Sequence, residues 1–256
     1  MFDKIMKDGI ERIYSEDINS QRTYIENICK VVREMPSDII YKAQGFFVPN
    51  DDYMIRYFTS EIMEPSYDCY HATGICYWHL HLVFPVYDVS NEIVGLVGFN
   101  PINKLKATEE GQWDLPSYRH SSKTLFNKSK YLFMLKDTFR NALEQGYIVL
   151  TDGVFDMLSF AQNNVLSGAL LGSYVSEELF AMLRLLNRVY VSIDNDEAGL
   201  KLYNQLNRGL SNVIAIKQNQ FKDADDILKS EYKERFLKEF FNNLNNPIKM
   251  DLIFRV

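Results

Sequence analysis

The sequence predicts an α/β protein in which a parallel sheet is flanked by helices. Two short apolar runs carry this prediction, residues 148–156 (IVLTDGVFD) and 189–199 (VYVSIDNDEAG), and each stops at acidic residues and a glycine. Short runs rich in β-branched and aromatic residues and bounded by turn residues are typical of buried parallel strands. The residues after Asp152 have helical apolar spacing, so we expect the first strand to enter a helix through a tight turn at Gly153.

The chain between the two runs continues the alternation of strands and helices. Residues 169–173 (ALLGS) have the pattern of a second strand and its turn, and residues 176–186 have that of a helix. The expected order is therefore strand, helix, strand, helix, strand. Strands that alternate with helices in this way favour a parallel sheet.

Four carboxylates are expected to meet at one edge of this sheet. Asp152 and Asp156 follow the first strand, and Asp194 and Asp196 follow the later one. Ligands of open α/β sheets bind at the carboxyl ends of the strands. Carboxylates gathered there repel one another unless cations neutralise them, and oxygen ligands suit Mg²⁺ or Mn²⁺, with room for two ions. The alternative is that Asp152 and Asp196 only cap the helices that follow them, which leaves Asp156 and Asp194 unexplained.

These motifs, in this order, resemble the Toprim domain of bacterial-type DNA primases. The family pattern runs E-G-x-x-D, L-G-[TS], D-x-D-x-A-G and K-D-x-D/E. The matching residues here are 152–156 (DGVFD), 171–173 (LGS), 194–199 (DNDEAG) and 222–226 (KDADD). Asp152 stands where the family has glutamate. The resemblance implies catalytic roles for the four carboxylates, metal contact for them and for Asp223, and a turn at Gly172.

The last of these motifs is the weakest. A solvated acidic loop before a helix over residues 227–241 would look the same, and Asp225 and Asp226 would then only cap that helix.

The chain before residue 145 resembles the N-terminal lobe of the same primases. Residues 82–100 (LVFPVYDVSNEIVGLVGFN) predict a β-hairpin with its turn near residues 88–92. They are similar to the family phrase F-P-[IV]-x-D-x-x-G-x-[IV]-[IV]-G-[FL]. Residues 105–116 are polar and charged, and we expect a surface loop there.

A basic segment follows, and it separates a primase from other Toprim proteins. Residues 118–135 (YRHSSKTLFNKSKYLFML) resemble the family segment K-Y-x-N-S-x-x-T-x-[LF]-x-K-[GS]-[KR]-x-L-[YF]-x-L. Between residues 115 and 136 there are five basic side chains and no acidic one. Such a local excess of charge is suited to phosphates, although most charge runs are simply solvated. The predicted contacts to nucleic-acid or nucleotide phosphates are Arg119, Lys123, Lys128 and Lys130.

Composition excludes several other classes. The formal net charge of −6 does not indicate general nucleic-acid binding, and no apolar run approaches the length of a membrane span or a signal peptide. We expect no membrane association and a cytoplasmic location, the bacterial host cytosol if the protein is phage-encoded. Cys69, Cys76, His71, His79 and His81 only loosely imitate a zinc site, so no zinc is expected.

The resemblance implies a division into four segments and an activity. The segments are an N-terminal helical segment (1–40), a primase-like lobe (41–145), a Toprim domain (146–226) and a C-terminal helical tail (227–256). The implied activity is that of a DNA primase, a metal-dependent nucleotidyltransferase that makes short RNA primers on single-stranded DNA from ribonucleoside triphosphates. The alternatives are a catalytically silent primase-like module and a Toprim-type nuclease.

No zinc ribbon or helicase-binding domain is visible, so a replicative helicase or accessory protein is expected to act in trans. The apolar stripe of residues 232–241 either receives that partner or packs on the Toprim core.

Overall fold

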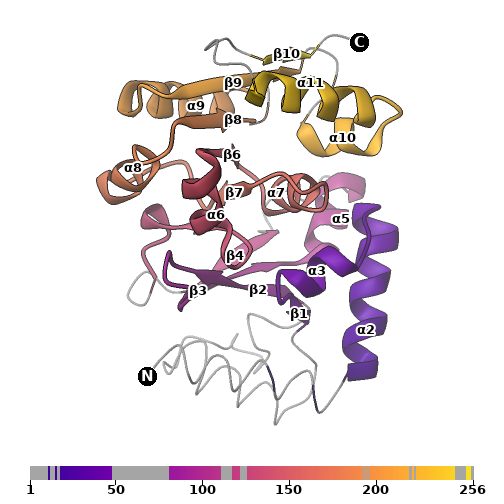
Figure 1. The fold of residues 1–256 in the computed structure, drawn as a ribbon. Coiled ribbons are helices and arrows are strands. Elements are labelled where there is room, and N and C mark those ends of the chain that lie inside the picture. Colours follow the sequence, from indigo (N-terminus) through magenta and orange to yellow (C-terminus); the bar gives the residue numbers. More distant parts are fainter. Residues whose placement is uncertain are drawn as a thin grey trace. The chain divides into compact units, whose positions relative to one another are not determined.

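The computed structural model describes most of the chain. It covers residues 18–47, 81–110, 117–121, 126–192, 196–218, 223–245 and 252–254, and singly Glu11, Ser15, Asp194 and Phe221. Lys123, Cys69, Cys76, His71 and His79 lie outside these residues. The chain divides into two compact units, residues 1–127 and 128–256. The α/β class that the sequence predicts is confirmed, because both units combine strands and helices (Figure 1).

The first unit carries an antiparallel sheet of order β1-β2-β3-β4. Its strands are β1 (Phe46–Phe47), β2 (Leu82–Tyr87), β3 (Ile93–Phe99) and β4 (Tyr118–His120). The predicted hairpin is confirmed, since β2 pairs with β3 and the Asp88 carboxylate accepts hydrogen bonds from the backbone of Ser90 and Glu92. The helical elements are α2 (Ile18–Asn27), the π-helix η1 (Ile28–Arg33), α3 (Asp38–Lys42) and α5 (Pro101–Glu110).

Helix α5 corrects the first half of the loop that the sequence predicts over residues 105–116, while residues 111–116 lie outside the described residues. The helix extends to Glu110. Asn100 starts it, because its side-chain oxygen accepts hydrogen bonds from the backbone N–H groups of Ile102 and Asn103. Pro101 occupies the first helical position, where its missing N–H costs nothing. The Asn-Pro pair is a helix start signal that the charge of the segment concealed.

The second unit is built on a six-stranded sheet of order β10-β9-β8-β6-β7-β5. Its strands are β5 (Leu132–Phe133), β6 (Tyr147–Thr151), β7 (Ser167–Leu170), β8 (Arg188–Val191), β9 (Val213–Gln218) and β10 (Leu252–Phe254). All neighbours pair in parallel except β5, which runs antiparallel to β7. Because β5 belongs to this sheet, the sheet begins before residue 146, where the sequence places the start of the Toprim domain.

Helices connect these strands on both faces of the sheet. They are the 3₁₀ turn η4 (Lys128–Lys130) and helices α6 (Thr138–Gln145), α7 (Val154–Ala161), α8 (Glu177–Leu183), α9 (Glu197–Gly209), α10 (Ala224–Lys229) and α11 (Lys233–Asn245). The order from β6 to β8 is the predicted alternation of strands and helices. No helix in the described part of the chain is long and apolar enough to cross a bilayer.

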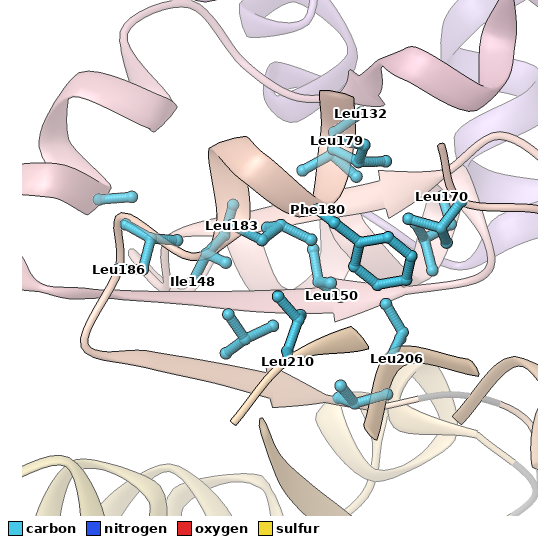
Figure 2. Close-up of a cluster of buried hydrophobic side chains, with 14 of the residues drawn as sticks. Leu132, Ile148, Leu150, Leu170, Leu179, Phe180, Leu183, Leu186, Leu206 and Leu210 are labelled. Atoms are coloured by element: carbon cyan, nitrogen blue, oxygen red, sulfur yellow. The ribbon is translucent and has the colours of Figure 1, made fainter. Parts of the chain in front are cut away.

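The core has two layers because successive residues of a strand point to opposite faces of a sheet. On one face, Ile148 and Leu150 of β6 pack with α8 and α9, and Figure 2 shows Phe180 of α8 among these side chains. On the other face, Tyr147 and Val149 pack with α7, α10 and α11. Fully apolar strands with this alternation are those of a sheet covered on both sides.

The C-terminal segment is part of this sheet rather than a helical tail alone. Phe236 and Phe240 of α11 are completely buried, and the Phe240 ring lies 5.1 Å from that of Tyr190. Phe236 and Phe240 of the apolar stripe therefore pack on the core, as one of the two predicted uses requires, while Phe241 of the same stripe stays 36% exposed. Strand β10 then pairs with β9, an addition that the sequence did not predict.

We predict that Gly209→Ala destabilises the protein. A Cβ at Gly209 would lie 2.4 Å from a ring carbon of Phe180, whose side chain is buried. Overpacking of this kind costs about 1–3 kcal/mol, which outweighs the gain of about 1 kcal/mol that alanine offers over glycine in a helix. Chemical denaturation measures the difference, with the exposed Asn204→Ala of the same helix as the control.

Two outcomes decide this prediction. Phe180→Leu should cost less in the Gly209→Ala background than in the parent, because the smaller side chain relieves the clash. A Gly209→Ala protein that is more stable than its parent would show that helix propensity dominates at this position.

Candidate active site at the carboxyl edge of the sheet

The parallel pairing of β6, β7 and β8 places their carboxyl ends on one edge of the sheet. Asp152 follows β6, Gly172 follows β7 and Asp194 follows β8. The ends of β6 and β8 are in contact, because the backbone N–H of Asp194 donates a hydrogen bond to Oδ2 of Asp152 at 3.3 Å. The two motifs lie 42 residues apart in the sequence and are brought together by the sheet.

Asp156 is the most unusual carboxyl group at this edge. It lies in the first turn of α7, and its Oδ1 is buried without a hydrogen-bond partner among the described residues. Burial raises the pKa of Asp156 well above its ordinary value of 3.8, and the charges of Asp223, Asp225 and Asp152 raise it further. A buried carboxylate without a partner is costly, so this group favours either a proton or a cation.

Asp152 has a milder environment. Burial raises its pKa, and the hydrogen bond from the Asp194 backbone lowers it in part. Asp152 does not cap α7, since no side chain caps that helix at Gly153. The alternative that Asp152 is only a capping residue is therefore wrong.

Asp196 does cap a helix, as the alternative proposed, and Asp223 caps another, which the sequence did not predict. Asp196 accepts a hydrogen bond from the Gly199 backbone at 2.7 Å at the start of α9. Asp223 accepts one from the Asp226 backbone at 3.0 Å at the start of α10. In both cases the bond uses Oδ1 of the carboxylate. Each side chain therefore stabilises the start of a helix, in addition to any contact with a ligand.

The glycines of the motifs provide space. Gly153 has an extended backbone (φ −111°, ψ 141°) and not the special conformation that a tight turn requires, which corrects our expectation. A Cβ there would lie 2.2 Å from Oδ2 of Asp156. Likewise, a Cβ at Gly199 would lie 2.1 Å from the backbone oxygen of Asp194. Both glycines let the acidic segments approach the adjoining helix start.

Asp225 has a role that the sequence did not indicate. Its carboxylate accepts a hydrogen bond from the hydroxyl of Ser159 and pairs with Lys229 at 2.5 Å. Ser159 lies in α7, the helix that also carries Asp156. Asp225 lies in α10, the helix that begins directly after Asp223. The contact therefore joins these two helices. Asp225 is therefore not a helix cap. The only sequence signal was the Asp225–Lys229 spacing of four residues, which favours an ion pair on a helix.

The basic side chains of η4 lie at the same edge, because β5 runs antiparallel to β7 and begins where β7 ends. A Cβ on Gly172 would lie 3.4 Å from Nζ of Lys128, so the ammonium group of Lys128 lies over the turn after β7. Lys130 instead pairs with Glu178 at 2.7 Å and lowers the pKa of that carboxyl group to about 2. Arg119 lies in β4 of the first unit, opposite Gly98.

These residues fit a hard divalent cation by their chemistry. All the candidate ligands are carboxylate oxygens, and the buried Oδ1 of Asp156 has no partner in the part of the chain that the structure describes. Among the described residues, no three carboxylate, imidazole or thiol groups converge on one coordination point. Mutual repulsion between carboxylates opposes such convergence until a cation supplies positive charge.

Comparisons with known proteins agree with this geometry. A sequence model of the Toprim-like family matches residues 149–228. A DNA primase of Thermotoga maritima is 31% identical over 169 residues, which is 63% of this chain and 28% of that protein, so the chain spans less than a third of this relative.

Solved structures of primases have the same fold. The E. coli primase catalytic core superposes with a TM-score of 0.71 at 18% identity, covering 96% of this chain and 87% of that one. A DnaG primase catalytic domain bound to single-stranded DNA superposes with a TM-score of 0.65 at 17% identity, covering 94% and 78%. The chain therefore has the fold of a bacterial-type DNA primase catalytic core, and the segment that carries the acidic edge is similar to the Toprim-like family.

Proposed function

We propose that this protein synthesises short RNA primers on single-stranded DNA from ribonucleoside triphosphates, as a metal-dependent nucleotidyltransferase. The observation that carries the proposal is that acidic side chains and a basic side chain lie at the same edge of the sheet. Asp156, whose Oδ1 has no partner among the described residues, lies with Asp152 and Asp194 after β6 and β8, and Lys128 lies over the turn after β7. A polymerase site needs acidic and basic side chains, because it binds cations and phosphates together. The names of the similar proteins, all primases, support the same reaction.

Mg²⁺ or Mn²⁺ is the cofactor that this donor set suits, with one or two ions. Asp152, Asp156 and Asp194 are the proposed ligands, and Asp196 and Asp223 border them. When bound, such ions polarise the reacting phosphate and stabilise the attacking and leaving oxygens of a phosphoryl transfer.

The side chains divide the remaining tasks by their positions. Lys128 neutralises nucleotide phosphates at the turn after β7. Asp152 is the proposed proton acceptor for the attacking hydroxyl, because burial raises its basicity while the Asp194 backbone holds its orientation. Arg119 and Lys123 are proposed to contact the template backbone, and Lys130 contributes less because Glu178 offsets its charge.

Template binding is expected to need help. The net charge of −6 and the acidic edge repel a DNA backbone over long range. We therefore propose that a helicase or accessory protein holds the template in trans. Phe236 and Phe240 of α11 do not belong to its docking surface, since both are buried.

A synthesis assay tests the function. The chain is incubated with single-stranded template, labelled ribonucleotides and Mg²⁺ or Mn²⁺, and the products are separated by size. New oligonucleotides that disappear in Asp194→Asn support the proposal. Degraded template would establish a nuclease instead, and neither product at any metal concentration would establish a silent module.

We predict that Lys128→Ala weakens nucleotide and single-strand binding more than Lys130→Ala does. Lys128 faces the turn after β7, whereas Glu178 already neutralises Lys130. Each phosphate contact that is lost should reduce the slope of log affinity against log salt by about 0.7 for a single strand. Fluorescence anisotropy at several salt concentrations measures that slope.

The control for this prediction is Lys136→Ala, since Lys136 follows β5 and lies at the opposite end of that strand from η4. Equal losses in all three variants would mean a diffuse charge effect and would remove Lys128 from the site.

We also predict that Asp156→Asn stabilises the metal-free protein at neutral pH. The folded pKa of Asp156 lies above its ordinary value of 3.8, so at pH values between the two the folded state holds a proton that the unfolded state releases, and above both the folded state carries a desolvated charge. The contribution of Asp156 to stability is therefore complete below about pH 3.8 and is lost as pH rises through the folded value. Each unit of that difference is worth about 1.4 kcal/mol. Denaturation in EDTA across this pH range measures the effect.

Adding Mg²⁺ should reverse the order of stability of the wild type and Asp156→Asn. Millimolar Mg²⁺ should stabilise the wild type and have little effect on Asp156→Asn, while the exposed Asp226→Asn behaves as the wild type. An Asp156→Asn protein that Mg²⁺ stabilises as fully as the wild type would exclude Asp156 from the cation site.

A further inference from the structure

An open cavity of 610 Å³ lies beside the turn that follows β7. This volume is within the range of small-molecule sites, about 300–1,000 Å³. The cavity is formed by the loop after Gly172 and by the first three turns of α9. Its lining residues are Ser173, Tyr174, Glu197, Lys201, Leu202 and Gln205.

The cavity offers an aromatic face to solvent. Tyr174 is 64% exposed, which is unusual for a large ring in a protein whose other tyrosines include the fully buried Tyr147 and Tyr190. Leu202 is buried and adds an apolar surface. The amide of Gln205 donates a hydrogen bond to the backbone oxygen of Val175 at 3.5 Å, so α9 supports the loop that carries Tyr174. The ring is thus presented on a supported loop.

The charges of the cavity cancel. Lys201 and Glu197 form an exposed ion pair at 2.7 Å, one turn apart on α9, and they are the charged residues among the described lining of the cavity. A phosphate group would meet the Glu197 carboxylate as well as the Lys201 ammonium, so the cavity has no net attraction for an anion. It suits an uncharged, flat and polar group that stacks on a ring and exchanges hydrogen bonds.

The cavity adjoins the proposed phosphate position. Tyr174 is two residues after Gly172, which limits the distance between their Cα atoms to about 7 Å. Lys128 lies over Gly172, and Glu197 directly follows Asp196 at the acidic edge. A ligand with its phosphates at Lys128 therefore reaches this cavity with its opposite end.

We propose that the cavity binds the nucleoside half of the incoming ribonucleotide, with the base stacked on the ring of Tyr174. This inference rests on the proposed function, because it assumes that Lys128 binds the triphosphate of the nucleotide. Stacking is tolerant of base identity, which suits a site that must accept every template-directed nucleotide.

Binding measurements with two probes test the proposal. ATP carries both halves of the ligand, whereas inorganic tripolyphosphate carries only the charged half. Calorimetry with Mg²⁺ compares the two probes in the wild type, Tyr174→Ala, Tyr174→Phe and Leu185→Ala. Leu185 is the control because it is an exposed apolar side chain (66% exposed) after α8, before β8 begins and hence at the opposite edge of the sheet.

The expected result is selective. Tyr174→Ala should weaken ATP binding roughly 5- to 150-fold, the usual worth of one base on an aromatic ring, and leave tripolyphosphate binding unchanged. Tyr174→Phe keeps the ring and should bind ATP within about twofold of the wild type, because stacking needs the ring and not the hydroxyl. Leu185→Ala should match the wild type with both probes.

Other results overturn the proposal. Unchanged ATP affinity in Tyr174→Ala, or equal losses for both probes, would show that the ring does not receive a base. A loss of single-stranded DNA binding with unchanged ATP binding would assign the cavity to the template. These binding results do not depend on turnover, so a chain that binds ATP through Tyr174 but makes no primers would contradict the proposed function alone.

Discussion

The parallel pairing of β6 with both β7 and β8 is the interaction on which the rest of the structure depends. Parallel strands present all their carboxyl ends at one edge, so three connecting segments far apart in the sequence converge there. The sheet can hold this arrangement because both of its faces are covered. Ile148 and Leu150 pack beneath α8 and α9, and Tyr147 and Val149 pack beneath α7, α10 and α11.

The crowded carboxylates at that edge repel one another, and this unfavourable electrostatic energy indicates a role beyond structure. Oδ1 of Asp156 is buried beside other acidic groups and has no hydrogen-bond partner among the described residues. The Asp225 contact to Ser159 holds α10 against α7, so that the acidic segments stay close. A purely structural capping role does not require such crowding. Lys128 adds the opposite charge at the turn after β7, while Lys130 is already matched by Glu178. The result is a site with separate places for cations and for phosphates.

Much of this was predictable from the sequence because the signals are local. The runs before Asp152 and Asp194 have the composition of buried strands, and their acidic and glycine residues mark the edge. Other features depend on contacts between distant segments. Strand β10 is a three-residue apolar run that becomes a strand only by pairing with β9, and no local pattern shows that Asp225 reaches Ser159.

Two predictions from the sequence, those for Gly153 and for the segment that forms α5, were wrong for different physical reasons. Gly153 is required for the space beside Asp156, which depends on a side chain three residues later and not on the backbone angle of the glycine itself. Helix α5 begins at an Asn-Pro signal that the surrounding polar residues obscured. The relation of Lys128 to Gly172 required the antiparallel register of β5 on β7, which lies beyond any sequence pattern.

The central claim is that the carboxyl edge is a cation site with Asp156 at its centre. Its most direct test is calorimetric titration of Mn²⁺ into the metal-free chain, repeated at several pH values. The account predicts saturable binding whose affinity falls as the pH is lowered, because a cation must compete with the proton that the raised pKa of Asp156 favours. Absence of saturable binding at millimolar Mn²⁺ would contradict the claim.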